Sequence, residues 1–67
     1  MEVKTLLNKL RLNECQTIRV FDNYEYFIES KSKKEIIEEC GSSSILDFEY
    51  SKFGNCFVIR ISKLKIN

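Results

Sequence analysis

Two segments of the chain alternate apolar and polar residues about a central turn, and this pattern limits the fold more than any other feature. The first segment, QTIRVFDNYEYFIES at residues 16–30, has a turn signal at Asp22-Asn23. The second, ILDFEYSKFGNCFVIRIS at residues 45–62, alternates on both sides of residues 52–55. Each segment therefore predicts a β-hairpin with one apolar face and one polar face.

In the first hairpin, a three-residue loop at 21–23 keeps the apolar residues on one face. That loop sets Val20 opposite Tyr24 and Arg19 opposite Glu25. A two-residue loop would shift the register by one and divide the apolar residues between the faces, so we reject it.

In the second hairpin, a four-residue loop at 52–55 does the same. The predicted apolar partners are Tyr50 with Phe57, Phe48 with Ile59, and Leu46 with Ile61. On the opposite face this register sets Asp47 across from Arg60. We therefore expect Arg60 to be held within its own sheet, as Arg19 is in the first hairpin.

Two further segments have the periodicity of helices. Val3, Leu6, Leu7 and Leu10 recur at helical spacing and predict a helix over residues 2–11. Ser32 and Glu35 have the spacing of a capping box, and Gly41 is a natural stop, so a second helix is predicted over 33–40. Its inner stripe is Ile36, Ile37 and Cys40.

The predicted order is α-β-β-α-β-β over a single domain of residues 1–67. We expect a two-layer α+β fold, with a four-stranded, mainly antiparallel sheet and two helices on one face. The way in which the two hairpins meet stays open. Residues 62–67 change the parity of their apolar residues, which predicts either a bulge or, as we favour, a loose basic tail.

The composition argues against an enzyme. The chain has no histidine, and its three cysteines, Cys15, Cys40 and Cys56, form no CxxC pair. We predict no catalytic residue, no metal site, no cofactor, and reduced thiols that serve packing. Cys56 is the best candidate nucleophile only because the register places it outside the core.

The chain contains no apolar run of membrane-spanning length and no signal peptide. We therefore expect a cytoplasmic protein that does not enter a membrane.

The sheet face without helices, together with an adjoining edge, is the predicted partner-binding surface. The registers place Phe27 and Val58 on it, together with Arg19 and Arg60. Such a face normally alternates to polar residues, so two apolar side chains favour contact with a host protein or a second copy of the chain. The competing interpretation is scattered apolar residues without a partner.

Lysine clusters support an alternative function. Lys31, Lys33 and Lys34 stand at the start of the second helix, and Lys63 and Lys65 lie in the tail. Together they could hold a phosphate or a nucleic acid. The net charge of +1 is too close to neutral to favour this alternative by itself.

The succession of VKTLLNKL, TIRVFD, KKEIIEECG, ILDF and FVIRI resembles short accessory proteins encoded by phages and mobile elements of low-G+C bacteria. That broad class includes inhibitors of host defence such as anti-CRISPR proteins. The resemblance implies a non-enzymatic protein that binds or inhibits a host protein, and it assigns no functional residue.

Overall fold

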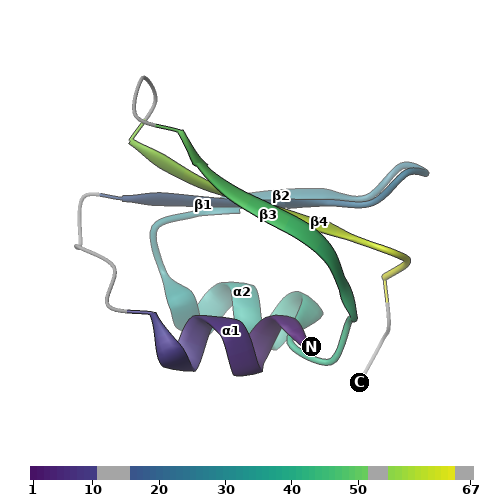
Figure 1. Cartoon of the computed structure of the whole chain (residues 1–67), viewed down its shortest axis with the longest axis horizontal. Helices are drawn as coiled ribbons and strands as arrows, with labels where there is room; N and C mark the ends of the chain where they lie inside the picture. The colour runs from purple at the N-terminus through teal and green to yellow at the C-terminus, as the bar shows by residue number, and fades with distance from the viewer. Residues whose placement is uncertain (11–15, 52–54, 65–67) are drawn as a thin grey trace.

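The chain folds into a four-stranded sheet with two helices packed against one face (Figure 1). The computed structural model describes residues 1–10, 16–51 and 55–64. In chain order the elements are α1 (Val3–Lys9), β1 (Thr17–Phe21), β2 (Phe27–Ser30), α2 (Lys33–Cys40), β3 (Ile45–Ser51) and β4 (Cys56–Ile61). The predicted α+β class and its two layers are confirmed.

The strand order is β2-β1-β4-β3, and the sheet is mixed rather than mainly antiparallel. Each hairpin is antiparallel, but the hairpins meet through β1 and β4, which run parallel. These two strands are the inner pair of the sheet, and their residues Ile18, Val20 and Ile59 are fully buried there.

The first hairpin has a longer loop than predicted, and two predicted pairs are wrong. Val20 pairs with Ile28 rather than Tyr24, and Arg19 pairs with Glu29 rather than Glu25. The cause is Asp22, whose carboxylate accepts hydrogen bonds from the backbone N–H groups of residues 24 and 26, at 2.8 and 3.1 Å. An aspartate that ties down its own turn in this way favours the wider loop.

The second hairpin keeps most of its predicted register. Tyr50 pairs with Phe57, Phe48 with Ile59, and Asp47 with Arg60, as predicted. A β-bulge follows, because Ile45 rather than Leu46 pairs with Ile61. The bulge turns Ile45 toward the core and leaves Leu46 half exposed.

Helix α1 is shorter than predicted, and both its ends are held by residues of α2 or of the segment that follows it. Its first N–H groups, of Val3 and Lys4, donate to the carbonyl oxygens of Ser43 and Gly41, each at 3.0 Å. At the other end the Lys33 ammonium donates to the carbonyl of Leu10. These contacts satisfy groups that a helix leaves free at its termini.

Helix α2 has the predicted bounds and the predicted cap. The hydroxyl of Ser32 accepts a hydrogen bond from the N–H of Glu35 at 3.2 Å. Gly41 follows the helix in a right-handed conformation, so positive φ is not the reason for glycine there. A Cβ at that position would lie 2.5 Å from the carbonyl oxygen of Ile37. The close approach of this oxygen is therefore the reason for glycine at position 41.

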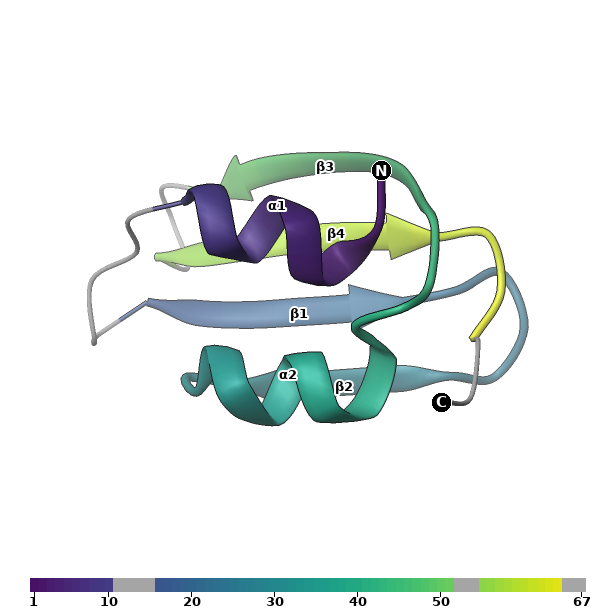
Figure 2. The ribbon, with the colours of Figure 1, turned by 90° about the horizontal axis from the view of Figure 1, so that it is seen from below.

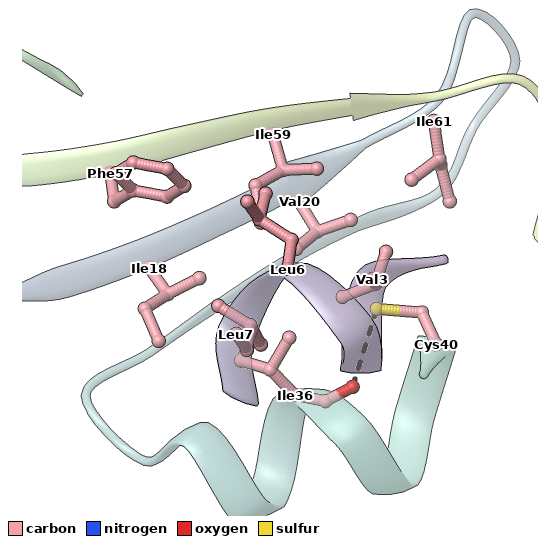
Figure 3. Close-up of a cluster of buried hydrophobic side chains, with 10 residues drawn as sticks. All are labelled: Val3, Leu6, Leu7, Ile18, Val20, Ile36, Cys40, Phe57, Ile59 and Ile61. Carbon is pink, nitrogen blue, oxygen red and sulfur yellow. Dashed lines mark hydrogen bonds between the residues drawn. The ribbon is translucent and has the colours of Figure 1, made fainter. Parts of the chain in front are cut away.

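The core lies between the helices and the central strands (Figure 3). Its buried members are Val3, Leu6, Leu7, Ile18, Val20, Ile36, Cys40, Phe57, Ile59 and Ile61. The Cys40 thiol donates to the carbonyl of Ile36 at 3.3 Å. Leu64, after the end of β4, also packs against this core, whereas residues 65–67 of the predicted tail lie outside the described residues.

Candidate functional site

The helices leave one strand uncovered on their own side of the sheet. Seen from the helix side, α1 runs over β4 and α2 over β2, while β3 lies at the edge beyond α1 (Figure 2). Three alternate residues of β3, Leu46, Phe48 and Tyr50, are 50%, 49% and 47% exposed. We call these three residues the β3 row.

The β3 row is continuous with the core. Phe48 and Tyr50 pair with Ile59 and Phe57, whose side chains are buried beneath the helices, so the four side chains share one sheet face. The rings of Phe48 and Phe57 lie 5.6 Å apart between centroids. This is the usual spacing of an aromatic pair, so Phe48 and Tyr50 extend the core into solvent as an ordered apolar surface.

The Tyr50 hydroxyl, at one end of the β3 row, is held by a hydrogen bond. The Tyr50 hydroxyl donates to the Oδ1 atom of Asn55 at 2.7 Å, across the mouth of the β3–β4 loop. Asn55 has a φ of 46°, a left-handed conformation that asparagine tolerates. The hydrogen bond fixes the position of the Tyr50 hydroxyl.

The backbone of β3 adds a second binding feature. Within the described residues, β4 is the one strand that pairs with β3. The outer edge of β3 is engaged at its start, where the Ile45 N–H donates to the Met1 carbonyl at 2.8 Å, and it has no partner strand further along among these residues. Unpaired N–H and C=O groups along such an edge can accept another strand. Asp47 and Glu49 alternate with the row along this edge and place two carboxylates on the opposite face.

The open face, opposite the helices, holds the four residues predicted to bind a partner. The register sets Arg19 beside Val58 and Arg60 beside Phe21, and Phe21 pairs with Phe27. Phe27 is 60% exposed, whereas Phe21 and Val58 are half-buried. Their partner-binding role stays a prediction.

Both arginines of the open face are engaged within the sheet. Arg19 Nε lies 2.7 Å from Glu29 Oε2, and Arg60 Nε lies 3.1 Å from Asp47 Oδ2. The hydrogen bond from Arg60 lowers the pKa of the Asp47 carboxyl. Pairs of this kind neutralise the charges that would otherwise draw a partner to this face.

The predicted lysine cluster is incomplete in the structure. Lys33 is held by the Leu10 carbonyl, which leaves Lys31 and Lys34 exposed at the start of α2. Lys63 is exposed, and Lys65 lies outside the described residues. Of the lysines assigned to the nucleic-acid alternative, Lys31, Lys34 and Lys63 are therefore the ones that the structure shows to be exposed.

Neither of the two cysteines that the structure describes is an exposed nucleophile. Cys56 lies on the open side of the sheet, as predicted, but its exposed fraction is 1%. Cys40 is buried in the core, and Cys15 lies outside the described residues. Neither described cysteine forms a disulfide, and the described residues contain no cluster of metal-ligating side chains.

A shallow depression of about 570 Å³ lies at the far end of the first hairpin. It is lined by Asp22, Tyr24, Glu25, Tyr26, Lys63 and Leu64. The Tyr26 hydroxyl is buried beside the Cys40 thiol without a hydrogen bond of normal geometry, and burial raises the pKa of both groups. These groups stay neutral at ordinary pH and offer no acid–base pair.

The sequence pattern missed the β3 row as a surface. It assigned Leu46, Phe48 and Tyr50 to the apolar face that the helices cover, because alternation does not say which strand lies at an edge. One signal was present: both polar positions between the row residues, Asp47 and Glu49, are acidic. Charged residues are typical of edge strands.

Comparison with known proteins gives no relative. No protein-family model, no curated protein and no solved structure matches this chain. Among the described residues, no helix has the length and apolar character needed to cross a membrane.

Proposed function

We propose that this chain is a non-enzymatic protein-interaction module that captures a partner protein through the β3 side of its sheet. The observation that carries the proposal is the half exposure of Leu46, Phe48 and Tyr50 on one edge strand. Three large apolar side chains exposed on one short strand, two of them paired with core residues, are typical of a binding surface in so small a protein.

Two features favour the β3 row over the open face as the main contact. On the open face, Arg19 and Arg60 are occupied by ion pairs, and Phe27 is the one large apolar side chain that is mostly exposed there in the described residues. On β3, apolar side chains and an unpaired strand edge occur together. A partner can then gain both apolar burial and backbone hydrogen bonds.

Affinity capture with two matched double variants tests the proposal. The row variant combines Leu46→Ser with Tyr50→Ser, and the open-face variant combines Phe27→Ser with Val58→Ser. Phe48 is left intact because its ring contacts Phe57 in the core. Circular dichroism and thermal melting establish that both variants remain folded.

The proposal predicts that a protein retained by the wild type is retained by the open-face variant and falls at least about tenfold with the row variant. Capture that is unchanged in the row variant contradicts it. Loss in the open-face variant alone would instead identify Arg19, Phe27, Val58 and Arg60 as the contact surface.

A further inference from the structure

The free edge of β3 has a regular part that a strand can join. The bulge between Ile45 and Asp47 interrupts the ladder at the start of β3, and the register from Asp47 to Ser51 is continuous. Along this part Phe48 and Tyr50 lie on the helix side, and Asp47 and Glu49 lie on the open face. The edge therefore presents apolar side chains on one face and carboxylates on the other.

The two carboxylates differ in whether they already form an ion pair within the described residues. Asp47 is held by Arg60 on the neighbouring strand. Glu49 pairs along the backbone with Val58, and it forms no ion pair within the described residues. A strand added at this edge would place one of its side chains directly beside Glu49, on the side away from Val58.

Self-pairing through this edge is disfavoured by charge. If a second copy adds its β3 antiparallel, with the helices of both copies on one side, the registers that pair most of the strand are centred on Asp47, Phe48 or Glu49. The first sets two Asp47 carboxylates, each already held by Arg60, opposite each other, and the last sets two Glu49 carboxylates opposite each other with no such ion pair. The middle register sets Asp47 against Glu49, and like charges directly opposite each other destabilise a sheet.

We infer that the β3 edge binds an extended segment of a partner protein in which basic and apolar residues alternate. Its backbone pairs with residues 47–51, its apolar side chains lie beside Phe48 and Tyr50, and a lysine or arginine lies beside Glu49. The inference rests on the proposed function and adds the chemistry of the partner. The carboxylates and the bulge disfavour pairing with neutral or acidic strands, as the same features do at other protected sheet edges.

Synthetic peptides test this directly. The probe is a seven-residue peptide of alternating lysine and valine, blocked at both ends. Its first control alternates glutamate with valine, and its second has the lysines and valines in separate blocks. Binding is followed by the amide signals of the isotope-labelled wild-type protein in an NMR titration.

The lysine–valine peptide is expected to bind at least about tenfold more tightly than either control and to shift the amide signals of residues 47–51. Methylating alternate backbone nitrogens separates the two edges of the peptide. One methylated set abolishes binding, because those N–H groups face β3, and the other set leaves it intact. Equal binding of all peptides, or shifts confined to the open face, would overturn the inference.

A charge reversal provides the decisive control. Glu49 is exposed, so Glu49→Lys should leave the fold intact, and it should reverse the preference so that the glutamate–valine peptide binds more tightly. An unchanged preference, or a wild-type dimer through β3 in sedimentation equilibrium, would refute the inference. If the row variant loses its captured protein while no peptide binds, the proposed function stands and the inference fails.

Discussion

Phe48 and Ile59 are paired along the backbone and lie on the same face of the sheet, yet Ile59 is fully buried and Phe48 is 49% exposed. The difference comes from position, since Ile59 lies on a central strand beneath the helices and Phe48 lies one strand further out (Figure 2). The boundary of the core therefore runs between β4 and β3, and the outer strand keeps its apolar side chains available to a partner.

Asp22 should set the register of the first hairpin. Replacing it by alanine removes the acceptor of two backbone N–H groups, those of residues 24 and 26. We expect Asp22→Ala to lower the free energy of unfolding by about 2 kcal/mol, measured by urea denaturation. Asp22→Asn keeps an acceptor oxygen and should cost much less, and an equal loss in both variants would contradict this role.

Gly41 should be intolerant of a side chain although its φ is negative. Alanine normally stabilises such a position, but here its Cβ would meet the carbonyl oxygen of Ile37 at 2.5 Å. We expect Gly41→Ala to destabilise the fold by about 1–3 kcal/mol in thermal or urea denaturation. Ser42→Ala, at the next position, serves as the control. A stabilised Gly41→Ala variant would show that the helix end relaxes freely.

Stability should fall at alkaline pH because of Cys40. Burial raises the pKa of this thiol, so the folded state keeps the proton that the unfolded state releases above about pH 8.5. The stabilisation is complete below that pH and is lost as the pH rises toward the folded-state pKa. Tyr26 acts in the same direction at higher pH.

Urea denaturation under reducing conditions, at several values between about pH 7 and pH 10, measures this effect. Cys40→Ala should be less stable than the wild type at neutral pH, because it leaves a small cavity, and should lose less stability on going to alkaline pH. Parallel pH profiles for the two proteins would exclude Cys40 as the cause.

The lysines should not make this protein a nucleic-acid binder. Lys33 is engaged with the Leu10 carbonyl, and the net charge is +1. We expect negligible retention on single- or double-stranded nucleic acid at physiological salt. Strong retention with a steep fall as salt rises, reduced by the double variant Lys31→Gln and Lys34→Gln, would establish the alternative function instead.

Much of the fold follows from sequence pattern, and its limits have identifiable causes. The helix over 33–40, the Asp47–Arg60 pair and the two-layer class are confirmed. The register of the first hairpin was wrong because the predicted loop, 21–23, and the observed loop, 22–26, put the same parity of residues on each face. Alternation therefore cannot choose between them, whereas the Asp22 hydrogen bonds can.

The candidate surface was harder to predict from the sequence than the fold was. Phe27 and Val58 were predicted on the open face, and the structure places them there. The exposure of Phe48 depends on strand order, because the same apolar pattern would be buried in a central strand. Strand order arises from the parallel pairing of β1 and β4, which no local pattern encodes.

The most direct measurement is site-specific photocrosslinking in lysate of the source cells. A benzophenone side chain is placed at Leu46, in the β3 row, or at Phe27, on the open face, since both native side chains are at least half exposed. The account predicts a defined crosslinked partner from position 46 and none, or far less, from position 27. Crosslinking from position 27 alone, or the same adducts from both positions, would contradict it.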